Sequence, residues 1–418
     1  MKPLLRSDSK ATILRRIFAC FVTLFATAVV ADEWNILAIR VEFPFEEPDQ
    51  RTTTGIGSFD LRSPELARSD SDYVLPYDLP PHDALYFDHH LQSLSRYYDT
   101  VSEGRVAIEY SIYPQGATDA YTLPKPMLYY GNGRSTEEIG TRWIELLKDA
   151  FELARLDEGG PNFSDFNSFL VIHAGVGHET GELNDIRSVF LQPTDFLQFN
   201  GGPLLIDDIQ IDSAWILPES PSRTGRGGLN GLMAKFFGNQ LGLPGMSNFS
   251  DGLPALGGWS LMDVGANALG FVRRDSLDAV VGFVPPHPMA WSKAQLGWID
   301  PLVVVRDTVL SIAATDRDSQ FPRAVRIPVN REEYFLLEYR RQRANLGAPE
   351  GLQVRGVDDE KVLWLDLSQI QFSGDNEGVW LGVDEYDSFV PGSGLLIWHI
   401  NEKVITGAEG LAFNNDPV

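Results

Sequence analysis

Cysteine is almost absent from this 418-residue chain. The single cysteine, Cys20, lies in an N-terminal segment where basic residues precede the apolar run Ile17–Val30, which ends at small residues next to Ala31. This pattern is typical of an export signal, and the run is shorter than the roughly 20 apolar residues that span a bilayer. We therefore expect residues 1–31 to be removed. The secreted or extracytoplasmic product would have no disulfide and would depend on its core or on bound ions.

Basic residues are also scarce, with 34 Lys and Arg against 58 Asp and Glu and a formal net charge of −24. Loss of residues 1–31 removes five basic residues and one acidic residue, which changes the net charge to −28. Such a surface repels phosphate backbones and anionic lipid, so nucleic-acid and membrane-surface roles are excluded. Cys20 stands near the start of the apolar run, which excludes a lipid anchor after signal cleavage. Arg15-Arg16 leaves the twin-arginine route open beside the general export route.

The pattern of apolar residues predicts two domains, since a single core rarely grows beyond about 250–300 residues. Residues 32–300 mix strand and helix patterns. Residues 301–418 carry short apolar runs separated by Pro, Gly and Asp, which favour a β-rich domain. The chain ends in the polar sequence "FNNDPV" without a closing element, so we expect this domain to be truncated.

Several elements of the first domain follow from periodicity. The spacing predicts a half-buried strand over 36–43, a helix through Phe87 and Tyr98, and a strand over 105–114. Ser135, with Glu138 three residues later, predicts a capping box at the start of a second helix. A buried strand is expected over 169–175. A further helix is expected to contain Phe236 and to stop at Gly242.

The chain lacks the HExxH motif that a zinc peptidase of the gluzincin or metzincin kind carries. In that motif, histidines at i and i+4 bind zinc from one helix face, and the glutamate at i+1 is the general base. In metzincins the helix ends at a glycine, a third ligand follows, and a methionine turn lies beneath the metal. The stretch "AKFFGNQLGLPG" (234–245) has this frame with other residues in it. It places Lys235, Phe236, Asn239 and Gly245 at the first ligand, base, second ligand and third ligand, with Met262 in the methionine turn.

The frame resembles the immune inhibitor A-like family of secreted metallopeptidases. The matching positions are Gly238, Leu241, Gly242, Leu243, Pro244, Gly258, Trp259, Leu261 and Met262. The resemblance continues in collinear order through "SLSRYYDTVSEGRVAI" (93–108), "FLVIHAGVGHE" (169–179), "AWSKAQLGWI" (290–299), "EYFLLEYRRQ" (333–342) and "GSGLLIWHI" (392–400). It implies an α/β zincin, metzincin-like domain with a mixed twisted sheet and an active-site-type helix, followed by the β-rich domain.

This sequence departs from the family pattern at the positions of the zinc ligands and the general base. A lysine ammonium, a phenyl ring and a glycine offer zinc no ligand, and an asparagine amide is a poor one. We therefore expect no catalytic zinc, and we predict a pseudopeptidase that binds a peptide or protein partner. The alternative is an active hydrolase with a relocated metal site. For Lys235 two interpretations stay open: a solvated side chain, or an ammonium in place of the zinc cation. Phe236 is interpreted as core filler, and Asn239 as a partner of Lys235.

Seven histidines remain as ligands for a relocated metal. The best candidates are His173, His178 and Glu179 in "HAGVGHE", although His173 ends a buried strand. The others are interpreted as follows: His89 and His90 point apart on one helix, His399 packs in the β domain, and His82 and His287 stand in proline-rich loops without a visible partner. Calcium is the cofactor that stays open. Its candidate donors are Asp207, Asp208, Asp212 and Asp251, against the alternative that these are ordinary surface carboxylates.

Overall fold

The computed structural model describes residues 31–46, 50–70, 73, 75–222, 225–247, 253–316, 319–343, 345–346, 363–374 and 378–407, without the side chains of 345–346 and 405–407. Residues Ala31–Val418 form one compact unit. The predicted export signal before residue 31, the "FNNDPV" end and Asp251 lie outside the described residues, so those predictions remain predictions. The division at residue 300 likewise remains a prediction.

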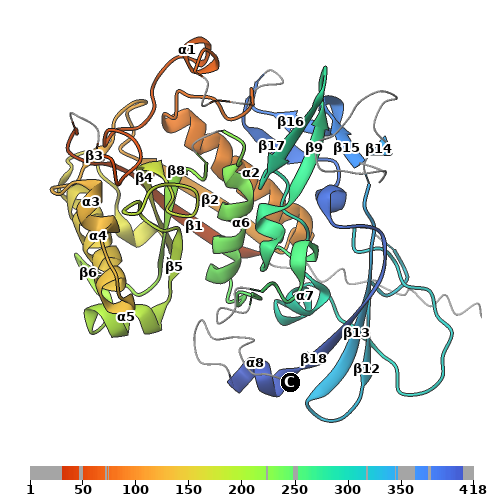
Figure 1. Cartoon of the computed structure of the whole chain (residues 1–418). Coiled ribbons are helices and arrows are strands. Elements are labelled where there is room, and N and C mark those ends of the chain that lie inside the picture. The colour runs from red at the N-terminus through yellow and green to blue at the C-terminus, as the bar shows by residue number, and fades with distance from the viewer. Residues whose placement is uncertain are drawn as a thin grey trace, which may run out of the picture. The chain divides into compact units, whose positions relative to one another are not determined.

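A mixed sheet organises the first part of the chain (Figure 1). Its strand order is β2-β1-β4-β8-β5, and β3 pairs with β1 beside this path. The strands are β1 (Asp32–Glu42), β2 (Val106–Tyr113), β3 (Tyr121–Thr122), β4 (Ser168–Val176), β5 (Val189–Leu191) and β8 (Ala214–Ser220). All pairs are parallel except β5 with β8, which is antiparallel and lies at the edge. In the parallel register, Ile36 is opposite Tyr110 on β2 and Ser168 on β4.

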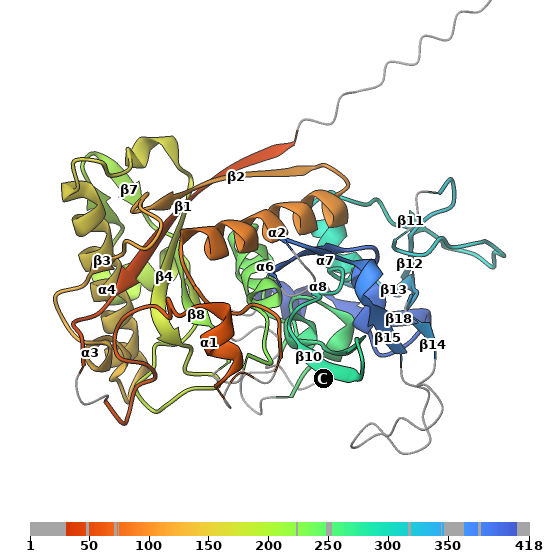
Figure 2. The same ribbon diagram turned by 90° about the horizontal axis from the view of Figure 1, so that it is seen from above.

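Helices cover both faces of this sheet. Ile36 and Ala38 of β1 belong to a core with residues of α2 and α6, whereas Leu37 and Ile39 belong to a second core with α4. Figures 1 and 2 show α2 and α6 on one side of the strands and α4 on the other. The prediction that this strand is half-buried was therefore wrong. A central strand of a parallel sheet loses both faces to the crossover helices.

The three main helices are α2 (Ala84–Ser102), α4 (Thr136–Leu156) and α6 (Leu229–Gln240). All three confirm helices expected from periodicity. Ser135 caps α4 by accepting the Glu138 N–H at 3.2 Å, but the Glu138 carboxylate accepts the Arg134 N–H instead of the Ser135 N–H. Only half of the predicted capping box forms.

The shorter elements fill the connections. The short helices are α1 (Pro64–Arg68), α3 (Met127–Gly131), α5 (Pro193–Asn200), α7 (Ala290–Gln295) and α8 (Glu402–Gly407). Single 3₁₀ turns are η1 (Phe163–Asp165), η2 (Gly257–Trp259), η3 (Val264–Asn267), η4 (Leu367–Gln369) and η5 (Tyr386–Phe389). Strands β6 (Leu204–Ile206) and β7 (Ile209–Ile211) form a separate hairpin.

Short strands dominate the last third of the chain. One sheet has the order β10-β9-β15-β14, with β9 (Leu269–Arg273), β10 (Leu277–Val281), β14 (Asn345–Leu346) and β15 (Leu363–Asp366). A second has the order β11-β12-β13-β18, with β11 (Leu302–Val303), β12 (Ala324–Pro328), β13 (Glu333–Arg340) and β18 (Gly394–Asn401). Strands β16 (Ile370–Phe372) and β17 (Trp380–Val383) pair with each other. The pairing of β9 with β15 joins segments from both sides of residue 300. The apolar run "VLSI" (309–312) is not a strand.

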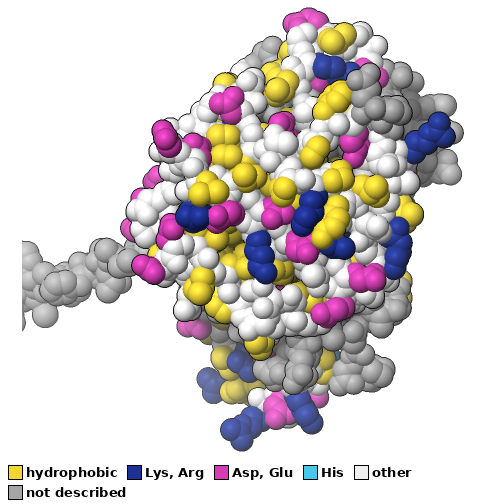
Figure 3. Space-filling model, turned by 90° about the vertical axis from the view of Figure 1, so that its left-hand side faces the viewer, with side chains coloured by type: hydrophobic (Ala, Val, Ile, Leu, Met, Phe, Trp, Pro, Cys, Tyr) yellow, Lys and Arg dark blue, Asp and Glu magenta, His cyan; other side chains and the backbone are white. Residues whose placement is uncertain are grey.

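The face that carries α3, α4 and α5 mixes acidic, basic and apolar side chains (Figure 3). Basic groups stand between the acidic ones there, for example Arg155 beside Glu152 and Arg142 beside Glu145. Within the described ranges, no helix is both long enough and apolar enough to cross a membrane.

Candidate functional site

Helix α6 carries the residues that the sequence placed in a zinc-site frame. The helix starts after Gly228 and ends at Gln240, and Gly242 follows with φ of 90°, a left-handed conformation that favours glycine. The Leu243 N–H then closes the end by bonding to the Gly238 carbonyl at 2.9 Å. The predicted helix stop is confirmed, and the chain turns back toward the segment that contains Met262.

Lys235 is held by the segment that follows Met262. Its ammonium donates to the Asp263 backbone carbonyl at 3.4 Å. Burial lowers the pKa of Lys235, and the negative charge of Asp263 partly opposes that shift. Of the two interpretations left open, a solvated side chain does not fit this geometry, because the ammonium is turned into the protein toward Asp263. Its standing in place of a zinc cation stays a prediction.

Asp263 is itself a fully buried carboxylate. One of its oxygens accepts the Ser247 hydroxyl at 2.6 Å, and the other accepts the Leu256 and Gly257 N–H groups at 2.6 and 2.9 Å. Three hydrogen bonds and a nearby ammonium offset the cost of burying this charge. The Lys235 ammonium on the helix and the Asp263 carboxylate after Met262 are therefore both bonded within the protein.

The other three positions of the frame lie on α6 or just after it. Phe236 is partly buried and packs against the larger core, as expected for core filler. The Asn239 side-chain amide donates to the Leu243 carbonyl at 2.8 Å. The predicted pairing of Asn239 with Lys235 was therefore wrong, since the open helix end supplies a carbonyl within closer reach. Gly245 follows Pro244 in a half-buried turn.

Met262 lies directly beneath α6. It is fully buried, and a Cβ built at Gly238 would lie 2.7 Å from its sulfur and 3.1 Å from the Tyr98 hydroxyl. The absence of a side chain at position 238 lets the helix approach the methionine this closely. Helix α6 and the segment that contains Met262 therefore pack closely through Gly238, while the assignment of this packing to a zincin site stays a prediction.

The candidates for a relocated metal do not form a ligand set. In the described part of the chain, no group of three His, Cys, Asp or Glu side chains is arranged to hold a metal ion. His173 is fully buried and its Nδ1 lies 2.9 Å from the Ala174 carbonyl, while burial lowers its pKa to about 4. Glu179 is exposed and accepts the Ser188 N–H at 2.8 Å. His178 lines a pocket together with Trp143 and Arg187, and neither His173 nor Glu179 lines that pocket.

The described calcium candidates are surface residues of one hairpin. Asp207 and Asp208 form the turn between β6 and β7, and Asp207 adopts φ of 50°. The Asp207 side chain is 64% exposed and faces Arg155 at 3.8 Å. Asp208 and Asp212 are also exposed. Asp207 and Asp208 are turn residues, Asp212 follows β7, and all three are exposed. Calcium binding by these residues stays a prediction.

Four other histidines occupy places that the sequence did not reveal. His399 is exposed on β18, with 46% of its side chain accessible, so its interpretation as a packed core residue was wrong. Residues alternate across a strand, and His399 falls on the outer side, opposite the buried Ile400. His90 is fully buried and bonds Asn230 of α6 at 2.8 Å. His82 and His287, which showed no partner in the sequence, are both buried and hydrogen-bonded.

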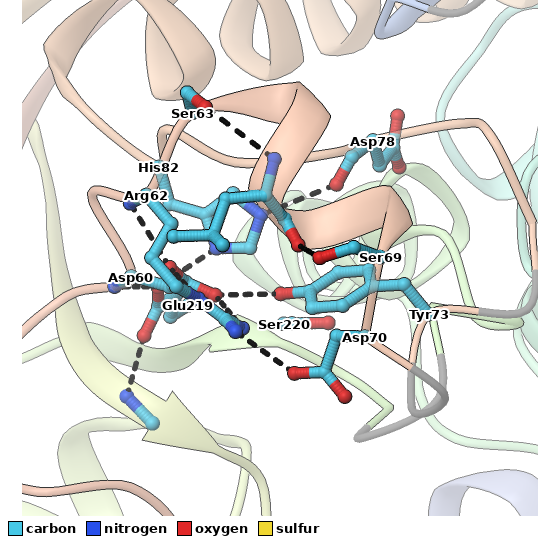
Figure 4. A network of polar contacts seen from close by, with 12 residues as sticks. Asp60, Arg62, Ser63, Ser69, Asp70, Tyr73, Asp78, His82, Glu219 and Ser220 are labelled. Atoms are coloured by element: carbon cyan, nitrogen blue, oxygen red, sulfur yellow. Dashed lines mark hydrogen bonds and ion pairs between the residues drawn. The ribbon is translucent and has the colours of Figure 1, made fainter.

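His82 forms a buried ion pair at the edge of a pocket of about 400 Å³. Its Nδ1 lies 2.7 Å from Glu219 Oε1, and its Nε2 lies 3.2 Å from the Asp78 carbonyl (Figure 4). Both ring nitrogens thus face acceptors, which is the arrangement of an imidazolium. Burial alone lowers the pKa of His82, but the hydrogen bond and charge of Glu219 outweigh it and the net shift is upward.

Glu219 is engaged on both oxygens. Besides His82, its Oε1 accepts the Asp60 N–H at 2.6 Å, and its Oε2 accepts the Gly175 N–H at 2.8 Å. Tyr86 lies against the His82 ring with centroids 4.2 Å apart. The pair is therefore stabilised by backbone donors and by an aromatic ring, as a buried ion pair requires.

A second polar group extends this network toward the opening of the pocket. The Asp60 carboxylate accepts Arg62 Nε at 2.9 Å and the Tyr73 hydroxyl at 3.0 Å. Arg62 also reaches Asp70 at 2.8 Å. Burial raises the pKa of Tyr73, and the charge of Asp60 adds to that shift. Figure 4 shows these side chains converging from the segment before α1 and the segment that follows it.

The His82 pocket lies where open parallel sheets bind ligands. It is lined by Gly175 and Val176 at the carboxyl end of β4, by Glu219 and Ser220 at the carboxyl end of β8, and by the segment 54–62 that follows β1. The chain leaves β1 toward β2 and leaves β4 toward β8 on the other side. The carboxyl ends of β1 and β4 thus mark a topological switch point, the usual position of a ligand crevice.

The polar groups of His82 and Glu219 are engaged within the protein. Both ring nitrogens of His82 face acceptors, and both oxygens of Glu219 accept N–H groups. One sequence signal pointed to part of this pocket: some of its residues end or follow the strands expected over 36–43 and 169–175. Its partners are up to 159 residues apart, which local patterns do not reveal.

Comparisons with known proteins add little to this description. No protein-family model and no curated protein matches the chain. Among the solved structures that match, the crystal structure of wild-type OgpA from Akkermansia muciniphila is 13% identical; the alignment covers 92% of this chain and 88% of that chain, with a TM-score of 0.31. A TM-score this low carries no argument about fold or function. The resemblance to the immune inhibitor A-like family is therefore supported by its motif residues alone.

Proposed function

We propose that this chain is an exported protein built on the immune inhibitor A-like metallopeptidase plan, that it lacks zinc chemistry, and that it acts by binding a peptide or protein partner. The observation that carries the proposal is the position of Lys235. It occupies the first ligand position of the frame predicted from the sequence, and its ammonium is bonded to the Asp263 carbonyl at 3.4 Å. An ammonium has no lone pair for a metal, and its charge opposes a second cation beside it.

The edge of the main sheet supplies a surface for such a partner. β5 is the last strand in the sheet order, it pairs with β8 on one side, and it contacts α6. An extended peptide binds a strand edge through main-chain hydrogen bonds, while neighbouring pockets select its side chains. Phe190 of β5 is partly buried against the same core as Phe236 of α6. We propose that the partner's extended segment lies along β5, next to α6.

Binding of fluorescein-labelled casein peptides to the purified protein tests this proposal by fluorescence anisotropy. We expect saturable binding without cleavage. Phe190→Ala removes apolar contact beside the edge and is expected to weaken binding by about tenfold, the effect of about 1.4 kcal/mol. The matched control is Leu197→Ala, which truncates a 65% exposed side chain on α5. Equal affinities for the two variants would contradict the edge-strand site, and cleavage of the peptides would contradict the pseudopeptidase.

A further inference from the structure

A further pocket, which we call the Arg187 pocket, is positively charged on a protein that is acidic overall. It has a volume of about 240 Å³ and lies between the end of α3, the start of α4 and the segment 178–187. Its charged lining residues are Arg134, Arg187 and Asp185, with His178 beside them. With histidine counted as neutral, the lining has one excess positive charge, whereas the whole chain has a formal net charge of −24. This local reversal of sign favours an anionic ligand.

A close approach of two loops brings the arginines into one pocket. A Cβ built at Gly131 would lie 1.9 Å from the Asn184 backbone oxygen, so the absence of a side chain lets the end of α3 approach this segment. Arg134 then donates to the Asn184 side-chain oxygen at 2.9 Å and to the Gly133 carbonyl at 2.9 Å. Arg187 belongs to the same loop as Asn184. The two guanidinium groups therefore line one pocket, although they come from distant parts of the sequence.

No neighbouring carboxylate neutralises either guanidinium. Among the residues that the structure places, neither Arg134 nor Arg187 forms an ion pair, and Arg187 forms no side-chain hydrogen bond. An arginine carries five N–H donors, so most of the donors of this pair are left to water or to a ligand. Both arginines are exposed, and a ligand can therefore reach them from solvent.

The nearest carboxylates are engaged with other donors. Asp185, which is 1% exposed, accepts the Thr54 N–H at 2.6 Å, the Thr54 hydroxyl at 2.5 Å and the Glu182 N–H at 2.6 Å. Glu138 lies outside the lining and accepts the Arg134 backbone N–H at 2.8 Å. The accessible charges of the pocket are therefore its cations, and the contact positions of both guanidinium groups toward the pocket stay available to an anion.

The rest of the wall is apolar. Ile139 and Trp143, both half-buried, lie one turn apart on α4, and Tyr130 and the exposed Leu183 complete this side. A ligand that fills the pocket thus meets arginines at one end and an aromatic, apolar wall at the other. Sites for drug-sized ligands measure about 300–1,000 Å³, so this smaller pocket suits one small acid or one residue.

We propose that the Arg187 pocket binds a carboxylate that is carried next to an apolar or aromatic group. The planar guanidinium fork matches a carboxylate, and a single negative charge balances the single excess positive charge of the lining. The apolar group packs against Trp143. A free aromatic acid and the C-terminal residue of a peptide are the two sources of this chemistry. The proposal does not rest on the peptide site along β5.

Isothermal titration of the purified protein with small probes tests the proposal. The acids are 3-phenylpropionate and acetyl-phenylalanine, each compared with its own amide. We expect at least one acid to bind saturably and its amide to bind about tenfold more weakly or worse, because the amide has no negative charge. Acetate is also expected to bind about tenfold more weakly, because it has no ring to contact the apolar wall. The tighter acid identifies the source as a free acid or a peptide C-terminus.

Three results would overturn the proposal. The first is equal binding of both acids and their amides. The second is tighter binding of phenyl phosphate than of either acid, which would assign the pocket to a phosphoryl group. The third is the absence of saturable binding by either acid.

A pair of matched variants locates the site. Arg187→Gln is expected to weaken binding of the tighter acid by about tenfold or more and to leave the amide unchanged. Arg331→Gln, the same change at an exposed arginine between β12 and β13, is expected to leave both unchanged. Circular dichroism checks the fold, and Arg134→Gln takes the place of Arg187→Gln if that variant does not fold. Unchanged binding of the acid in the folded variant would contradict the assignment.

Discussion

At the scale of single residues, the His82–Glu219 pair shows how a buried charge is kept in this protein. The imidazolium has acceptors on both nitrogens, and the carboxylate has donors on both oxygens. Each charge is therefore tolerable only while the other is present. Such a pair gives the pocket a fixed, polar wall at the end of the sheet.

Glu219→Gln is expected to lower the free energy of unfolding by about 3 kcal/mol, because it leaves a buried imidazolium without its counter-charge. Its new amide nitrogen also faces N–H donors. The matched control is Glu137→Gln at an exposed position of α4, expected to change stability by less than about 0.5 kcal/mol. Urea denaturation of the two variants and the wild type measures both effects. A loss no larger than in the control would show that the pair does not form.

The same pair has a defined pH dependence. The pKa of His82 is raised above its ordinary value of 6.5 in the folded state. Its stabilisation is therefore fully present below about 6.5 and is lost as the pH rises through the folded pKa. The stability difference between wild type and Glu219→Gln should shrink accordingly above pH 6.5. A difference that grows with pH has the opposite sign and would contradict this assignment.

At the scale of elements, glycines decide how closely α6 approaches its neighbours. A Cβ at Gly231 would lie 1.9 Å from the Ala266 backbone oxygen in η3. At Gly238 it would lie 2.7 Å from the sulfur of Met262. A backbone carbonyl in a packed turn moves less readily than a flexible thioether. A side chain at position 231 is therefore expected to be more destabilising than one at position 238 of the same helix.

Gly231→Ala is expected to lower the free energy of unfolding by about 3 kcal/mol or more, and Gly238→Ala is expected to lower it by clearly less. Alanine improves helix propensity by about 1 kcal/mol at both positions, so that gain cancels in the comparison. Thermal and urea unfolding of the two variants measure the order. The reverse order would mean that α6 does not pack on η3 through Gly231.

Much of the element pattern was predictable from sequence, and for a local reason. Helices α2, α4 and α6 and strands β2 and β4 follow from periodicity, caps and glycine stops, which act over a few residues. β1 was misjudged as half-buried because the alternation of Ile39, Val41 and Phe43 does not report a second helix layer. The Glu138 carboxylate accepts a hydrogen bond from the Arg134 N–H, so the predicted capping box is incomplete.

The candidate sites were predictable only in part. Residues 235–245 and Met262 were found because one motif frame spans them. The His82 pocket was not, since Asp60, His82 and Glu219 meet only after the parallel sheet has formed. Likewise, no local sequence pattern around His287 predicts that Lys293 of α7 is its hydrogen-bond partner. The proline-rich loops around His82 and His287 showed no partner for either ring, whereas both histidines are buried and hydrogen-bonded.

At the scale of the whole molecule, a mixed sheet with helices on both faces and a strand-rich last third hold α6 against the segment that contains Met262. Met262 is buried beneath Gly238, and the chain turns at Gly242. The polar groups of this helix bond to the protein itself. Lys235 bonds the Asp263 carbonyl, and Asn239 bonds the Leu243 carbonyl. The partner-binding role that we propose rests on these internal bonds.

Zinc content by elemental analysis tests the central claim most directly. The wild-type protein, purified in zinc-containing buffer and dialysed, is compared with the variant Lys235→His, Phe236→Glu, Asn239→His and Gly245→Asp, which restores the family's chemical positions. We expect less than about 0.1 zinc per wild-type chain, since an ammonium offers no ligand, and close to one zinc per restored chain if the frame is otherwise intact. Stoichiometric zinc in the wild type, together with chelator-sensitive casein cleavage, would contradict the account.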